Sequence, residues 1–174
     1  MESILLIAGI VFATAGIGLL IWEKVKKSQR QRYYRAANKL IREQHLEDAI
    51  RNGDGGRSCV GIRHLMVALK VKGQKGLGYV FDPTQEIRIG RNIEDNDVCL
   101  QDLSVSAHHC SIFLYENHLC VKDFGSANGT IIKSGFRRRE TLYETMGFLQ
   151  NKSRLWVGST CFIITVFYCE TAAN

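Results

Sequence analysis

The chain has 174 residues and a hydrophobic content of 45%, which is enough for a packed core and excludes a disordered chain. Its length predicts one domain, or one domain with an appendage. The formal net charge of +6 is uneven, because residues 1–58 hold 10 Lys+Arg against 6 Asp+Glu while residues 59–174 hold 13 against 11.

The first predicted element is an apolar helix over Ser3 to Trp22, a stretch without a charged side chain. At about 1.5 Å per residue it would span about 30 Å, the thickness of a bilayer's hydrocarbon core. Lys24 follows Trp22 closely, whereas Glu2 is the only charged side chain before the stretch. The positive-inside rule therefore predicts a single-pass anchor over residues 1–22, with the N-terminus outside and the remaining chain cytoplasmic.

A cleaved signal peptide is the alternative, because Ala13-Thr14-Ala15 fits a small-x-small cleavage site. The segment lacks the positive charge that normally precedes a signal peptide's apolar region. Strongly basic residues also follow it directly. Both observations favour the anchor.

Residues 23–58 are predicted to form a basic juxtamembrane helix, to about Arg51, and a glycine-rich linker. The positive charge is densest from Lys24 to Arg42, and we expect this band to contact anionic lipid head groups. Nucleic-acid binding is not expected, since no groove-reading motif accompanies the charge. A weak apolar stripe that includes Leu40 and Ile41 leaves two alternatives: a solvated stalk, or a helix packed on a partner or on the following domain.

Residues 59–174 are predicted to form an all-β domain, because short alternating segments and turn signals follow one another as in a β-sandwich. Residues 141–147 are expected to form a short helix or a partner contact. The predicted strands cover residues 65–71, 78–81, 86–90, 98–100, 110–114, 118–122, 130–133, 155–157 and 161–167.

The six cysteines contain no C-x-x-C pair. We expect reduced, structural thiols in a reducing compartment, with a disulfide or a metal site as the less favoured alternatives. The chain also lacks a P-loop, an H-E-x-x-H motif and a G-x-S-x-G motif. No metal, no cofactor and no enzymatic activity are therefore expected.

Three motifs place polar residues in turns beside hydrophobic strands. They are Gly90-Arg91 after a strand, Asp-x-x-Val-Ser-x-x-His ending at His109, and Asp-x-Gly-Ser-x-Asn-Gly-Thr ending at Thr130. Loops at one end of a β-sandwich lie close together. An arginine, a hydroxyl and an amide brought together in this way suit a phosphate group.

This ordered set resembles the forkhead-associated (FHA) domain, a phosphothreonine reader, over about residues 63–169. The resemblance implies that Arg91 pairs with the phosphate, that Ser106 donates its hydroxyl to it, and that Asn128 hydrogen-bonds the ligand backbone. It also implies three residues that shape the loops without touching the peptide: Gly90, His109 and Gly129.

Ala107 and Ala127 depart from the family pattern, which usually has a polar or basic residue after the serine and a hydroxyl before the asparagine. Each missing hydrogen bond to a charged partner would cost about 1–3 kcal/mol. His108 could compensate if it points into the loop. The leading hypothesis is a membrane-anchored adaptor that binds phosphothreonine. The alternative is a structural subunit of a membrane complex with a degenerate, phosphate-independent domain.

A basic run, Phe136-Arg-Arg-Arg-Glu140, follows the Asn-Gly strand. It is interpreted either as a solvated loop or as a contact with the inner leaflet or an acidic partner.

Overall fold

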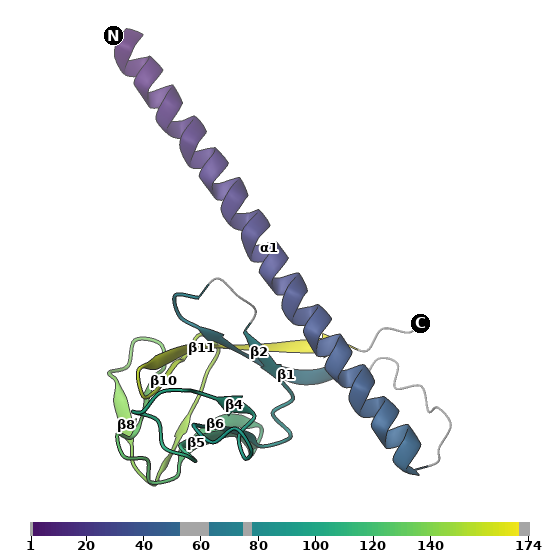
Figure 1. Ribbon diagram of the computed structural model, residues 1–174. Coiled ribbons are helices and arrows are strands. Elements are labelled where there is room, and N and C mark those ends of the chain that lie inside the picture. The colour runs from purple at the N-terminus through teal and green to yellow at the C-terminus, as the bar shows by residue number, and fades with distance from the viewer. Residues whose placement is uncertain (1, 53–62, 75–77, 171–174) are drawn as a thin grey trace. The chain divides into compact units, whose positions relative to one another are not determined.

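The computed structural model describes residues 2–52, 63–74 and 78–170, with side chains in the long helix described for residues 15–44 and 47. The chain divides into two compact units, Met1–Ala36 and Ala37–Asn174 (Figure 1). The linker predicted around residues 53–58, and Cys59 with it, lies outside the described residues.

Helix α1 runs without interruption from Glu2 to Asn52, so the helix predicted from residue 23 to about residue 51 is confirmed. Among the residues that the structure describes, no helix has the length and apolar character needed to cross a membrane. The anchor predicted over Ser3 to Trp22 is therefore not supported. The side chains of residues 3–14 in that segment lie outside the described ones.

The second unit contains the β-sandwich that the sequence predicts, built from one six-stranded and one five-stranded sheet. The first sheet has the order β2-β1-β11-β10-β7-β8, with strands Tyr79–Phe81, Arg63–Val71, Thr160–Glu170, Arg154–Val157, Thr130–Lys133 and Glu140–Leu142. The second has the order β4-β3-β5-β6-β9, with strands Val98–Cys99, Ile87–Gly90, Cys110–Tyr115, His118–Asp123 and Met146–Phe148.

Alternating side chains fix which face of each strand enters the core. In β3, Ile87 and Ile89 are buried while Arg88 between them is exposed, as the period of two in a strand requires. The turn between β5 and β6 has positive φ angles at Glu116 and Asn117, of 48° and 62°. Two consecutive left-handed residues match the twist of the flanking strands and close a tight hairpin there.

Of the two alternatives for residues 141–147, the short helix is wrong, because the segment contributes to two strands. β8 pairs with β7 in one sheet, and β9 pairs with β6 in the other. The chain passes between the sheets through Tyr143–Thr145, where Glu144 has a φ of 52°. Strands of three residues have too little periodicity to be recognised in a sequence.

The second half of α1 belongs to the β-domain and packs on the outer side of the six-stranded sheet. Ala37 and Ile41 are almost completely buried, and the Cys169 thiol of β11 donates a hydrogen bond to Asn38 Oδ1 at 2.8 Å. Of the two alternatives for the apolar stripe, packing on the domain holds for Ile41. The side chains of residues 46, 49 and 50, in the same stripe, lie outside the described ones.

The described cysteines are free thiols, three of them buried: Cys110, Cys120 and Cys169. Complete burial raises the pKa of Cys110 to about 12, because a thiolate loses its hydration there. Cys110 is thus an uncharged core side chain at physiological pH.

Candidate ligand-binding loops

Arg91 leaves strand β3 at the point where two loops meet. Its backbone N–H donates to Ser106 O at 2.9 Å, and the N–H of Asn92 donates to Ala107 O at 3.2 Å. The exposed Arg91 side chain turns towards the same loop, because its Nε donates to Val105 O at 3.2 Å. The β3–β4 loop therefore holds a guanidinium group beside the loop that carries Ser106.

Gly90 allows this close approach. A Cβ atom at Gly90 would lie 2.2 Å from Ala107 O, a separation that no side chain tolerates. The absence of a side chain lets the two loops run against each other at this position.

Ser106 lies between the first loop and the turn that follows β6. Its Oγ accepts a hydrogen bond from the Ala127 N–H at 3.2 Å, which leaves the hydroxyl proton available for another acceptor. Its backbone N–H donates to His109 Nδ1 at 3.2 Å. Ser106 is thus held at both its backbone and its side chain.

The buried His109 ring joins two of the loops. Besides accepting from Ser106, the ring places Nε2 at 3.4 Å from Gly129 O, so the neutral tautomer with its proton on Nε2 satisfies both contacts. Burial lowers the pKa of His109, and this outweighs the hydrogen bond to Gly129 and the charge of Asp123, which raise it. His109 therefore acts as an uncharged brace between loops.

Asn128 reaches from the β6–β7 turn to the loop that precedes Ser106. Its Nδ2 donates to Ser104 O at 2.8 Å, and its backbone carbonyl accepts from the Tyr143 hydroxyl at 3.3 Å. The exposed amide keeps its Oδ1 as an acceptor beside the serine loop. Gly129 has a φ of 72°, and a Cβ atom there would lie 2.8 Å from the Tyr143 ring.

A buried carboxylate, Asp123, holds the turn that carries Asn128. Its Oδ1 accepts from the backbone N–H groups of Gly125, Ser126 and Glu144, and its Oδ2 accepts from the hydroxyls of Ser126 and Thr130 at 2.6 Å. Burial alone would raise the pKa of Asp123. The hydrogen bonds together lower it by more than burial raises it, so the pKa lies below the ordinary value. The carboxylate stays ionised and fixes the turn.

Asp102 holds the loop that carries Ser106 in a similar way. It accepts hydrogen bonds from Ser104, and also from the backbone and hydroxyl of Ser159 in the β10–β11 turn. These bonds lower the pKa of Asp102. Asp102 and Asp123 both belong to the sequence motifs, but the motifs gave no sign of this supporting role.

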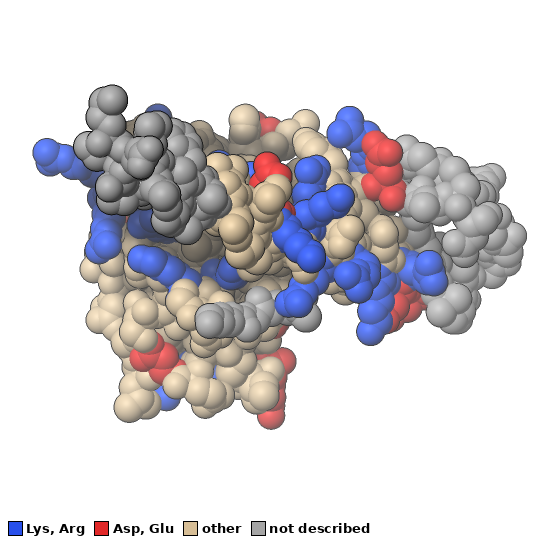
Figure 2. Space-filling view, turned by 90° about the horizontal axis from the view of Figure 1, so that it is seen from above, with Lys and Arg blue, Asp and Glu red and all other residues tan. Residues whose placement is uncertain are grey.

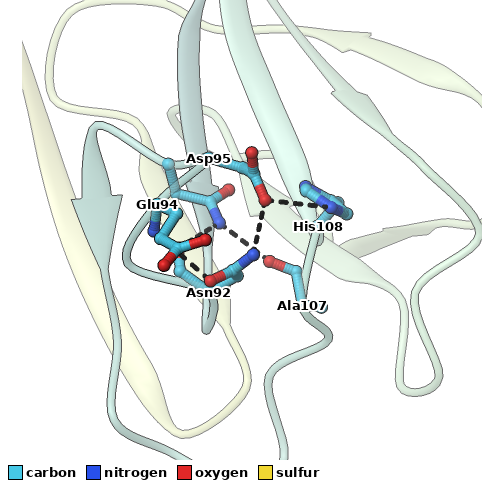
Figure 3. Close-up of polar contacts among 6 residues, drawn as sticks. Asn92, Glu94, Asp95, Ala107 and His108 are labelled. Carbon is cyan, nitrogen blue, oxygen red and sulfur yellow. Dashed lines mark hydrogen bonds and ion pairs between the residues drawn. The ribbon is translucent and has the colours of Figure 1, made fainter.

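His108 faces Asp95 of the loop between β3 and β4. Figure 3 shows its ring facing Asp95, with His108 Nε2 at 3.8 Å from Asp95 Oδ2. Asp95 also accepts from the Asn92 side chain. The compensation considered for His108 is therefore absent in this arrangement.

The two alanines expose no polar side-chain atom to a ligand. Ala107 contributes its carbonyl, which accepts from Asn96 Nδ2 at 2.8 Å. Ala127 contributes its N–H to Ser106. The three polar groups predicted for the site lie on loops linked by hydrogen bonds; they are the Arg91 guanidinium, the Ser106 hydroxyl and the Asn128 amide.

The β-sandwich carries Arg91, Ser106 and Asn128 on three loops that hydrogen bonds link to one another. Residues 87–158 match the sequence model of the FHA domain. FHA domains are phosphopeptide-binding interaction modules and not enzymes.

One sequence relative is an FHA domain-containing protein of Arabidopsis thaliana, 32% identical over 72 residues, which cover 41% of this chain and 19% of the relative. The chain thus spans about a fifth of that relative's length.

Two solved structures share the fold. The FHA domain of the CT664 protein from Chlamydia trachomatis is 21% identical, with a TM-score of 0.50 over 60% of this chain and 98% of that one. The FHA domain of an Arabidopsis thaliana hypothetical protein is 24% identical, with a TM-score of 0.51 over 70% of this chain and 99% of that one.

Proposed function

We propose that this protein binds phosphothreonine-containing partners through Arg91, Ser106 and Asn128. The observation that carries the proposal is the hydrogen bonding that sets these residues on adjoining loops. Arg91 N–H contacts Ser106 O, and Ser106 Oγ contacts the N–H next to Asn128. A guanidinium fork and a hydroxyl match the acceptor oxygens of a phosphate, and an amide can pair with a peptide backbone.

Calorimetric titration of the full-length chain with a phosphothreonine peptide library tests this function. The unphosphorylated library is the ligand control. Arg91→Ala should weaken binding by about 30-fold or more, the effect of losing a charge-assisted bond to a phosphate. Arg88→Ala is the matched protein control, because Arg88 is also exposed but lies in β3 and pairs with Glu86. Equal loss in both variants, or binding without the phosphate, contradicts the proposal.

A phosphate-independent assembly subunit is the second candidate, and the alanines at 107 and 127 favour it. In that case the partner would bind the same loops or another face without needing the guanidinium. Affinity purification of the full-length protein distinguishes the two functions. A reader loses its partner with Arg91→Ala and after phosphatase treatment, whereas a subunit retains its partner in both.

Membrane attachment with a cytoplasmic β-domain is a further part of the proposal. It is supported by the uncharged sequence from Ser3 to Trp22 and by the lysines that follow it. Lys26 Nζ lies 4.8 Å from the Trp22 ring centroid, a pairing suited to a membrane interface. Fractionation with a carbonate wash tests attachment, and protease accessibility tests orientation. Recovery of the full-length chain in the washed supernatant contradicts attachment.

A further inference from the structure

The outer face of the five-stranded sheet is apolar at the edge that β9 forms. Met146 and Phe148 of this strand have 46% and 55% of their surface exposed. Gly147 between them faces the core, since a Cβ atom there would lie 2.6 Å from Ile132 Cδ1 of the other sheet. The solvent-facing side of an antiparallel sheet is normally polar. An apolar side chain at both ends of this short edge strand therefore indicates a surface that associates with another molecule.

The apolar surface continues from β9 onto the neighbouring strands. Strand register places Phe148 opposite Cys120, and Cys120 opposite Phe113. The His118 ring meets the Phe148 ring edge-on, with their centroids 5.9 Å apart. Tyr115, which is opposite His118, is 46% exposed. The second half of α1 packs on the six-stranded sheet, whereas these aromatic side chains of the five-stranded sheet are open to solvent.

The backbone of β9 also has an open side, because β9 is the outermost strand of its sheet. Leu149 N–H donates to Leu119 O at 2.7 Å. Thr145 O accepts from the Asp123 N–H at 3.0 Å. These two bonds flank β9 and point to β6, and backbone groups alternate in direction along an antiparallel strand. The first and last residues of β9 therefore direct their N–H and C=O groups away from β6.

This edge lacks two of the features that commonly prevent strand pairing. Edge strands are often protected by a charged side chain or a proline, and Met146-Gly147-Phe148 contains neither. The Phe148 carbonyl accepts one long hydrogen bond, from Ser134 Oγ at 3.4 Å. A carbonyl oxygen has a second lone pair for another donor, so the strand can still pair.

A second copy of this chain fits the open side of β9. Antiparallel pairing of the two β9 strands about a two-fold axis at Gly147 puts each Met146 opposite Phe148 of the other copy. Both opposite pairs are of the hydrogen-bonded kind, which exchanges two backbone bonds per pair. The thioether of one copy and the aromatic ring of the other then lie side by side on the outer face, which is a favourable contact.

The same symmetry keeps like charges apart. Lys122 is opposite Met146, and its Nζ lies 5.7 Å from the Phe124 ring centroid. In the paired arrangement Lys122 and Lys122 of the second copy lie on the outer two of four strands, about 14 Å apart at about 4.8 Å per strand. This exceeds the screening length of about 8 Å. By contrast, the face seen in Figure 2 has more basic than acidic side chains, so two copies would repel each other there.

We infer that β9 pairs with β9 of a second copy, so that the protein forms a symmetric dimer in which two five-stranded sheets join edge to edge. Each copy contributes a strand of three residues and few exposed apolar side chains, so the interface is smaller than the standard area of about 800 Å² per partner. We expect a dissociation constant on the order of 10 μM. The interface does not include Arg91, Ser106 or Asn128, so the inference does not depend on phosphopeptide recognition.

Sedimentation velocity of the full-length chain in dodecylmaltoside micelles tests the dimer, at concentrations from about 1 to about 200 μM, which bracket the expected dissociation constant. Phe148→Asp should raise this constant by about 100-fold or more, because a symmetric interface loses each contact twice. Tyr79→Asp is the matched control and should leave the constant unchanged. Tyr79 is 41% exposed and lies in β2, at an edge of the other sheet.

Charge exchange tests the register of the two strands. Met146→Lys and Phe148→Asp should each weaken the dimer when present alone. An equimolar mixture of the two variants should form a heterodimer about tenfold tighter than either homodimer. In this heterodimer the new lysine is opposite the new aspartate on one side of the axis, and the native pair of Met146 and Phe148 remains on the other.

Several outcomes overturn the inference. They are a monomer at all concentrations, equal weakening by Tyr79→Asp, a dimer that survives Phe148→Asp, and a mixture no tighter than its components. Urea unfolding of each variant separates a loss of association from misfolding. Arg91→Ala should leave the dimer intact while it abolishes phosphopeptide binding, which separates failure of the dimer from failure of the ligand loops. Dissociation by Arg91→Ala also overturns the inference.

Discussion

The residues that support the ligand loops are here called the frame: His109, Asp123 and Asp102. The frame and the surface that the loops expose differ in how many polar groups they contain. Below, His109, Asp123 and Asp102 bind loop backbones and hydroxyls from every side. Above, Ala107 and Ala127 offer only backbone atoms, which other loop residues already use. The comparison teaches that residues other than Ala107 and Ala127 fix the loop conformation, so that the side chains at these two exposed positions can change without a change of fold.

The largest expected effect comes from breaking the frame. Asp123→Ala removes the acceptor of several buried donors and should lower the free energy of unfolding by about 3–5 kcal/mol. Urea denaturation monitored by circular dichroism measures this change. Asp82→Ala is the control, since Asp82 caps an exposed turn through Thr84 and its loss should cost about 1 kcal/mol or less. Similar costs for both variants would show that the Asp123 network contributes little.

Polar side chains at positions 107 and 127 should raise ligand affinity while the frame stays unchanged. Ala127→Thr adds a hydroxyl next to Asn128, and Ala107→Arg adds a cation next to Ser106. Each should tighten phosphothreonine peptide binding by about tenfold, or 1.4 kcal/mol, with unfolding midpoints unchanged. Calorimetry on the single and double variants measures the gain. The same gain with an unphosphorylated peptide would rule out a contact to the phosphate.

The frame should also respond to acid through His109. The ring is buried, so its folded-state pKa lies below the ordinary 6.5, and the folded protein favours the neutral form. This contribution to stability is complete above the unfolded pKa and is lost as the pH falls below it. Unfolding free energies measured across this range should therefore decrease towards low pH, and His109→Gln should flatten that slope. An unchanged slope assigns the pH dependence to other groups.

The smallest effect is expected from His108. Its contact with Asp95 is 3.8 Å long and exposed, and such pairs contribute little. His108→Ala should change both stability and peptide affinity by less than about 0.5 kcal/mol. A larger loss of phosphopeptide affinity would mean that the ring turns towards the ligand on binding.

Much of the sandwich was predictable because apolar and polar side chains alternate along its strands, or because the strands end at turn residues. The strand at Ile87 and Ile89 and the hairpin at Glu116–Asn117 are of this kind. β8 and β9 were missed, because their pairing partners β7 and β6 specify them and three residues carry no pattern. Short strands of this type depend on tertiary contacts that local sequence does not encode.

The candidate site residues were predicted from sequence motifs, whereas the residues that hold their loops in place were not. Sequence spacing points to Arg91, Ser106 and Asn128, but it gives no sign that Asp123 binds the N–H of Glu144, 21 positions away. Likewise, it gives no sign that His108 lies against Asp95 of another loop. Such contacts arise only after the sheets have assembled, so they become visible only in three dimensions.

The hydrogen bond from Ala127 N–H to Ser106 Oγ has a kinetic consequence. It holds the hydroxyl oxygen before any ligand arrives, so little loop ordering remains to be done during association. The entropic cost of ordering these loops arises during folding and not when the peptide binds. The observed rate of peptide association should then rise linearly with peptide concentration and show no saturating phase. Differences in affinity between peptides should therefore arise mainly from how long each peptide stays bound.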